Sequence, residues 1–204
     1  VWGTTQFSRG GLRLGATNAL PVEALYIQGQ GNADASTFDL FGFDQTIAGI
    51  ALNTGTATST NKIITNSITA TLSTLTINNT NVSNFGLTSA SAPSPAGRFT
   101  GNLRVVKNNT GELHVYGTNA NTGGWVMNDG ILSINGVHSG IGGLTVNGGT
   151  ALITSASTYT GGTTITGGTL QVSGTGRPGN VNNAMTINAG TFDLNGTNQT
   201  VGLL

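Results

Sequence analysis

Apolar residues alternate with small polar residues in short runs along much of the chain. The clearest runs are residues 144–147, 163–166 and 169–173, in which every second residue is apolar. Such alternation predicts half-buried β-strands. Gly-Gly pairs at 142–143, 148–149, 161–162 and 167–168 separate these runs and permit turns that need a positive φ. Because this stretch has no helical period, we expect an all-β protein.

The same alternation predicts strands elsewhere. They fall within residues 11–14, 24–28, 37–50, 62–65, 67–72 and 74–78. Residues 86–97 contain Pro93 and Pro95, which cannot donate hydrogen bonds to a strand ladder. We therefore expect a Pro/Ser-rich loop at 86–97, a candidate subdomain boundary within one body that spans residues 1–204.

Two internal repeats support a stacked architecture. Residues 113–134 match residues 151–172 at an offset of 38, and residues 37–46 match residues 191–200 at an offset of 154. Repeats of this length without a helical pattern indicate stacked units that cannot bury their own faces alone, as in a β-solenoid. The residues that define the repeats are Gly123, Gly124, Gly161, Gly162, Gly168, Phe38 and Phe192.

Residues 142–172, GGLTVNGGTALITSASTYTGGTTITGGTLQV, resemble the autotransporter-associated β-strand repeat of very large bacterial surface and secreted proteins. The part TYTGGTTI-x-GGTLQV is the most specific. The resemblance implies a right-handed parallel β-helix that is exported to the bacterial cell surface or beyond, often as a stalk or adhesive scaffold. At about 20 residues per coil, 204 residues would form roughly ten coils.

The composition fits such a stack. Only 7% of the residues are charged and the net charge is zero, so a basic surface for nucleic acid or an anionic membrane is not expected. Stacked coils align like side chains in ladders, in which Asn can bond to Asn whereas like charges repel. The chain has no cysteine, and no run of 18 apolar residues predicts a transmembrane helix. We expect neither a metal nor a cofactor.

Few residues are candidates for a binding or catalytic site. Asp34, Asp39 and Asp44 form the closest acidic group and are candidates for ligand, calcium or catalytic contacts, although Asp39 also fits a turn-forming role. Trp125 and Tyr159 lie near Thr-Gly-Gly corners, and the favoured interpretation is that they fill wide corners or loop bases; the alternative is an exposed ring that stacks on a sugar. The two histidines, His114 and His138, are expected at the surface.

These features favour a structural extracellular or cell-surface rod or fibre without a catalytic centre. The alternative is a carbohydrate-binding or carbohydrate-cleaving β-helix, with surface glycans as partners, and a trimeric fibre is a third hypothesis. Residues 200–204, TVGLL, form an apolar strand without a charged cap. We expect such an end to stack on adjoining repeats or on other copies of the chain, and we favour a segment of a longer repeat protein.

Overall fold

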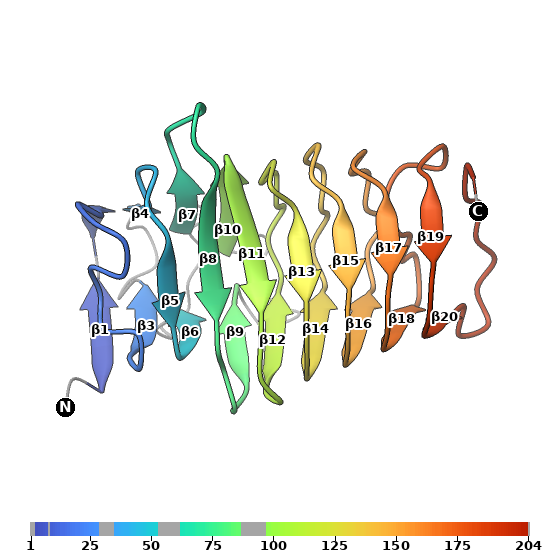
Figure 1. The fold of residues 1–204 in the computed structure, drawn as a ribbon, viewed down its shortest axis with the longest axis horizontal. Helices are drawn as coiled ribbons and strands as arrows, with labels where there is room; N and C mark the ends of the chain where they lie inside the picture. The colour runs from blue at the N-terminus through green and yellow to red at the C-terminus, as the bar shows by residue number, and fades with distance from the viewer. Residues whose placement is uncertain (1–2, 8, 29–34, 53–61, 87–96, 204) are drawn as a thin grey trace.

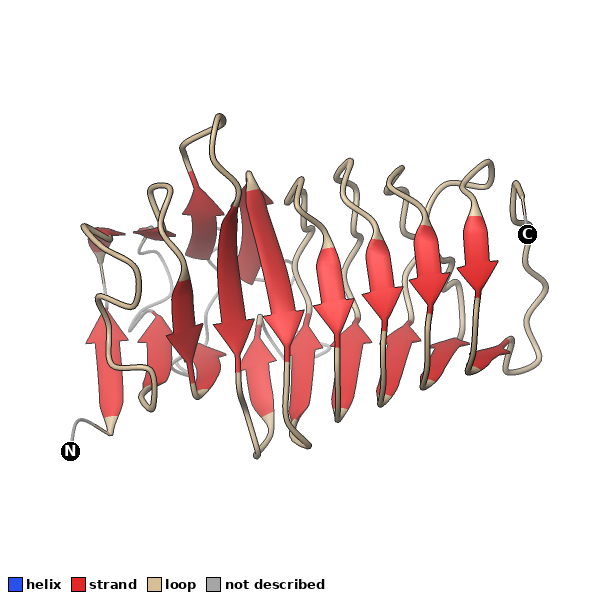
Figure 2. Cartoon of the chain, viewed as in Figure 1, coloured by secondary structure: helices blue, strands red, loops and turns tan. Residues whose placement is uncertain are grey.

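The computed structural model describes residues 3–7, 9–28, 35–52, 62–86 and 97–203. Within these residues every regular element is a β-strand, as Figure 2 shows. The strands pair in parallel in three sheets of nine, seven and four strands. The prediction of an all-β parallel β-helix is therefore confirmed.

The nine-stranded sheet receives one strand from every coil. It contains β1 (Thr4–Phe7), β3 (Leu25–Gln28), β6 (Gly49–Leu52), β9 (Ser83–Phe85), β12 (Glu112–Val115), β14 (Ile131–Ile134), β16 (Thr150–Ile153), β18 (Thr169–Val172) and β20 (Thr191–Asp193). The described residues thus show nine strands on this side of the stack, and the count of roughly ten coils stays a prediction.

The other two sheets complete each coil. The seven-stranded sheet contains β5 (Gln45–Ile47), β8 (Ser73–Ile77), β11 (Leu103–Lys107), β13 (Trp125–Met127), β15 (Leu144–Val146), β17 (Thr163–Ile165) and β19 (Met185–Ile187). The four-stranded sheet contains β2 (Gly10–Arg13), β4 (Ser36–Asp39), β7 (Lys62–Asn66) and β10 (Gly97–Gly101). Past β10 the third side continues as single parallel bridges, Asn119 to His138 and Ala156 to Arg177.

The coil is right-handed. In Figure 1 the strands of the seven-stranded sheet run downward in front and those of the nine-stranded sheet run upward behind, while the chain advances from left to right. A right-handed twist of the strands favours this sense of crossover between parallel strands.

The coil length explains one sequence repeat. Glu112 pairs with Ile131, Ile131 with Thr150 and Thr150 with Thr169 in successive coils. Asn128 and Asn147, which hold the same position in neighbouring coils, are 19 residues apart. The 38-residue repeat therefore comprises two coils. Earlier coils are longer, since Asn78 and Asn108, again at one position in neighbouring coils, are 30 residues apart.

Residues 87–96, which hold most of the predicted loop at 86–97, lie outside the described residues.

The repeat at offset 154 is not a structural equivalence. Phe38 lies in β4 of the four-stranded sheet, whereas Phe192 lies in β20 of the nine-stranded sheet. The Phe38 side chain is fully buried, and Phe192 is only half-buried. The two matching sequence segments therefore lie on different sides of the coil.

The interior is filled by the inward residues of every strand. Burial alternates along the strands, for example in β8, where Ser73, Leu75 and Ile77 are buried and the residues between them are not. The predicted strand at residues 67–72 is wrong, because this segment is a corner loop. The buried Asn66 side chain organises the loop: its Oδ1 accepts from the Ile68 N–H, and its Nδ2 donates to the Thr71 carbonyl.

Candidate functional site

Asp39 and Asp193 form the same kind of turn. The Asp39 Oδ1 accepts from the Phe41 N–H at 3.0 Å, and the Asp193 Oδ1 accepts from the Asn195 N–H at 2.8 Å. Phe41 and Asn195 both adopt a positive φ, of 49° and 45°. The two segments that match at an offset of 154 residues therefore share this local Asx turn, which agrees with the turn-forming interpretation.

Asp39 is already saturated with protein contacts. It accepts hydrogen bonds from the Ser67 N–H and hydroxyl, and it pairs with Arg13 at 3.3 Å. Burial alone would raise the pKa of Asp39, but the hydrogen bonds from Ser67 and Phe41 and the charge of Arg13 hold it below its usual value. The Arg13 guanidinium also lies 4.2 Å from the centroid of the Phe41 ring. This carboxylate secures a corner and has little capacity left for a ligand.

Of the other two acidic candidates, the structure describes only Asp44. The Asp44 Oδ1 accepts from the Thr74 N–H at 2.7 Å and so ties two successive coils together. Asp34 lies outside the described residues. Among the residues that the structure describes, no group of three or more His, Cys, Asp or Glu could hold a metal ion.

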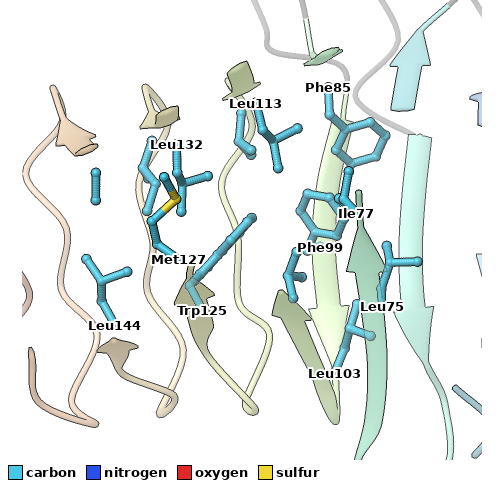
Figure 3. Close-up of a cluster of buried hydrophobic side chains, with 14 of the residues drawn as sticks. Leu75, Ile77, Phe85, Phe99, Leu103, Leu113, Trp125, Met127, Leu132 and Leu144 are labelled. Atoms are coloured by element: carbon cyan, nitrogen blue, oxygen red, sulfur yellow. The ribbon is translucent and has the colours of Figure 1, made fainter. Parts of the chain in front are cut away.

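The two aromatic candidates lie in the core. Trp125 is 1% exposed and Tyr159 is 0% exposed, so neither ring is available to stack on a sugar, and the burial agrees with the favoured interpretation that these rings fill the interior. Trp125 belongs to an interior row with Phe85 and Phe99, whose ring centroids are 4.6 Å apart, and its own ring lies 5.2 Å from Phe99 (Figure 3). The Tyr159 hydroxyl is 2.6 Å from the Thr163 Oγ1. Both rings fill the coil interior, because these wide corners need large apolar groups.

His138 continues this row, so the prediction that it lies at the surface is wrong. Its ring centroid is 6.2 Å from that of Trp125 and 4.9 Å from that of Tyr159, and the residue is fully buried. Its Nδ1 lies 3.3 Å from the Asn119 carbonyl, so Nδ1 donates and Nε2 is left without a hydrogen-bond partner among the described residues. Burial lowers the pKa of His138 to about 4, and the carbonyls of Asn119 and Gly142 offset only part of that effect.

His114 behaves as expected from alternation. It lies between the buried Leu113 and Val115 and faces outward, half-buried. Its Nε2 lies 3.0 Å from the Glu112 Oε2, and its ring stacks near Tyr116. The pair is a surface contact on one face of β12.

The Gly-Gly pairs make one corner of successive coils. Gly124 has a φ of 71° and Gly162 a φ of 80°, which residues with a Cβ rarely adopt. A Cβ on Gly123 would lie 2.6 Å from the Arg104 nitrogen, and one on Gly161 would lie 2.5 Å from the Ile141 carbonyl oxygen. Gly168, with a φ of 67°, serves another corner in the same way. Neighbouring backbones approach so closely here that only glycine fits.

Asparagine side chains form a ladder at the corner that follows the seven-stranded sheet. Asn108 Nδ2 donates to Asn78 Oδ1 at 2.9 Å, and Asn128 Nδ2 donates to Asn108 Oδ1 at 2.7 Å. Asn147 Nδ2 donates to Asn128 Oδ1 at 2.8 Å, and the Thr166 hydroxyl ends the series on Asn147 Oδ1 at 2.6 Å. The ladder links five coils. Its sequence signal was an Asn directly after the last residue of β8, β11, β13 and β15.

We expect Asn128→Ala to lower the free energy of unfolding by about 1 kcal/mol, because it breaks two ladder bonds at a partly hydrated corner. Urea unfolding measures this change. Asn188 is the matched control: it occupies the same corner after β19, and its side chain makes no hydrogen bond among the described residues. Asn188→Ala should change stability by less than about 0.5 kcal/mol. Equal losses in both variants would show that the ladder contributes nothing.

Lys107 is an unexpected interior cation. It lies in β11 between Ile77 and Met127 of the neighbouring strands and is fully buried. Its Nζ donates to the carbonyls of Asn108, Asn109 and Asp129 at 2.7, 2.6 and 3.1 Å. Burial lowers the pKa of Lys107 to about 8, and the charge of Asp129 opposes this shift. All three ammonium protons are used to hold one corner.

The architecture and a family comparison indicate the same class of protein. A right-handed stack of parallel coils, held by repeated glycine corners and an asparagine ladder, defines a β-helix repeat protein. Residues 105–134 and 151–172 match the family described as the Passenger-associated-transport-repeat, which confirms the resemblance to autotransporter-associated repeats. These two segments therefore match the repeat of this family. The first matched segment extends from β11 to β14 and the second from β16 to β18, so each includes strands of two successive coils. No curated protein and no solved structure gives a significant match.

The repeat family implies a passenger-type protein that is secreted or associated with the cell surface. In the part of the chain that the structure describes, no helix is long and apolar enough to cross a membrane.

Proposed function

We propose that the chain is a structural segment of a surface-associated passenger protein, which acts as a rigid spacer outside the cell. The observation that carries this proposal is that the columns of side chains continue from coil to coil without a change of register. From β12 to β18 every strand of the nine-stranded sheet pairs residue for residue with the strand of the next coil. Such a stack gives length and stiffness from local contacts alone.

Further coils of the same repeat are the partners that we propose for the end of the stack near β20. An apolar groove of about 450 Å³ lies there, lined by Met185, Ile187, Phe192, Leu194 and Val201, among other residues. Ile187 and Leu194 are 40% and 41% exposed, although residues at the matching positions of earlier coils, such as Ile165 and Val172, are buried. A coil with apolar residues in these columns would cover them as each coil covers the one before it.

The experiment inserts three copies of residues 131–149 directly after residue 149. Because each coil adds about 4.8 Å, we expect small-angle scattering to show a maximum dimension longer by about 14 Å with an unchanged cross-section. Three copies of residues 131–140 are the control, and this partial insertion should lower the unfolding midpoint. A wider particle of unchanged length would contradict the spacer. Electron micrographs of the native material then separate one long chain from filaments of stacked copies, which would show an axial repeat of one chain length.

A further inference from the structure

At its N-terminal end, the asparagine ladder stops one strand before the seven-stranded sheet does. Ile47 ends β5 as Ile77 ends β8. The Asn78 N–H donates to the Ile47 carbonyl at 2.9 Å, and each later ladder residue likewise donates its N–H to the carbonyl of the last strand residue in the preceding coil. The ladder position of the β5 coil is therefore residue 48, which is alanine. The methyl side chain of Ala48 cannot accept a hydrogen bond, so Asn78 has no ladder partner at this position.

A recess occupies this place. It has a volume of about 460 Å³ and is lined by Glu23, Thr46, Ala48, Asn78, Asn79 and Val82, among others. Its origin is a change of corner length: a single residue, Ala48, joins β5 to β6, whereas residues 78–82 join β8 to β9. Figure 1 shows the β8-to-β9 connection extending below the β5-to-β6 connection. The longer loop overhangs the short corner. We call this space the Ala48 recess.

Two amide side chains line the Ala48 recess, and each has one polar atom without a hydrogen-bond partner among the described residues. The Asn78 Oδ1 accepts from Asn108, but the Asn78 Nδ2 donates to no described residue. The Asn79 Oδ1 is buried and has no hydrogen-bond partner among the described residues, and Asn79 as a whole is only 1% exposed. The Asn79 Nδ2 donates to the carbonyls of Asn81 and Glu112, each at 2.7 Å, which fixes the orientation of the amide. Buried polar groups in native proteins almost always have a protein or water partner, so an acceptor held in this way calls for a donor, either an ordered water or a ligand hydroxyl.

The chemistry of the lining selects one ligand class. A fixed acceptor, a free amide donor and the exposed Glu23 carboxylate offer both senses of hydrogen bond, which suits hydroxyl groups that donate and accept. The Glu23 charge disfavours an anion. Glu23 is the single carboxylate of the lining, and no group of three or more His, Cys, Asp or Glu among the described residues could hold a metal ion. Val22 and Val82, 37% and 59% exposed, supply apolar surface at the rim. The volume lies within the range of small-ligand sites.

We propose that the Ala48 recess binds a short neutral saccharide, with the Asn79 Oδ1 and Glu23 carboxylate accepting from its hydroxyls and the Asn78 Nδ2 donating to them. This site is distinct from the acidic group around Asp39 and from the buried rings of Trp125 and Tyr159. It lies where three successive coils meet, on residues from the corners before β3, β6 and β9.

The test uses the chain of 204 residues and a panel of neutral disaccharides to tetrasaccharides of hexose and N-acetylhexosamine units. Binding is followed by saturation-transfer NMR and calorimetry, with calcium chloride and sodium sulfate as separate probes. The decisive variant is Ala48→Asn, which projects a larger side chain into the recess and gives Asn78 its missing ladder acceptor. We expect at least a tenfold loss of saccharide affinity with an unfolding midpoint that is unchanged or higher. Thr166→Asn changes the far end of the same ladder and should leave binding unchanged.

Glu23→Ala is a second variant at an exposed position, and we expect it to weaken binding at least fivefold. Three results would overturn the proposal: no saccharide bound at tens of millimolar, which would leave ordered water as the partner of Asn79; calcium or sulfate bound in preference to every saccharide; or full affinity in both Ala48→Asn and Glu23→Ala. None of these results bears on the spacer function, which is tested by the length of the particle.

Discussion

Replacing Gly124 by alanine should lower the free energy of unfolding by about 2–5 kcal/mol. Gly124 has a φ of 71°, where a residue with a Cβ costs about 1–2 kcal/mol. The added Cβ would also meet the Gly143 carbonyl oxygen of the next coil and would lie 2.7 Å from the Gly143 nitrogen. Overpacking of this kind costs a further 1–3 kcal/mol or so. The Gly143 carbonyl accepts from the Trp125 N–H, so the strain would reach β13 directly.

Urea unfolding followed by circular dichroism measures this loss. Gly11 is the matched control: it lies in β2, its φ is not positive, and a Cβ there would meet nothing within 4 Å. Gly11→Ala should change stability by no more than about 0.5 kcal/mol. If Gly124→Ala were as stable as Gly11→Ala, the Gly-Gly corners would not be required by close packing between coils.

Stability should fall between pH 6.5 and pH 4 because of His138. The pKa of His138 is about 4 in the folded chain and about 6.5 when unfolded, so in this interval the unfolded chain binds more protons. The contribution is fully present above pH 6.5, declines as the pH falls, and is lost below about pH 4. The difference of about 2.5 pH units corresponds to about 3 kcal/mol. The physical reason is that a protonated ring would place an unpaired charge between Trp125 and Tyr159.

The comparison of the native chain with His138→Phe isolates this effect. Phenylalanine keeps the ring between its aromatic neighbours, and the Asn119 carbonyl keeps its hydrogen bond from the Ser139 N–H at 2.8 Å. Urea unfolding at intervals from pH 3.5 to pH 7.5 should give a curve for His138→Phe that is flatter than the native one by about 3 kcal/mol. Parallel curves would mean that His138 is hydrated in the folded state.

Period-two alternation predicted the strands well where the coil is regular. The predicted strands at 163–166 and 169–173 correspond to β17 and β18, and Gly162 of the Gly161-Gly162 pair has the expected positive φ. The predicted coil length of about 20 residues agrees with the 19-residue register of the regular coils. The internal match appears at an offset of 38, which is two coils, because the Thr-Gly-Gly sequences match best in alternate coils. In the coil between them, Gly142-Gly143 follows Ile141 instead of threonine.

The side chains of corners were predicted poorly. Alternation fixes which way a residue points only within a strand, and both His138 and Tyr159 lie on the third side, where single bridges replace strands. Trp125 begins β13, so its inward direction depends on where the preceding glycine turn ends. The Ala48 recess depends on the difference between two corner lengths, which only the register of the strands reveals.

The direction of the ladders also determines how the molecule responds to force. Backbone hydrogen bonds between coils, and the asparagine bonds beside them, run along the axis of the stack and not across it. Bending must stretch many of these bonds on one side of the stack at once. Pulling on the two chain ends, by contrast, breaks the bonds of only one coil at a time. The protein should therefore resist buckling but unwind under axial tension. In the regular part, each peeled coil releases about 65 Å of extended chain.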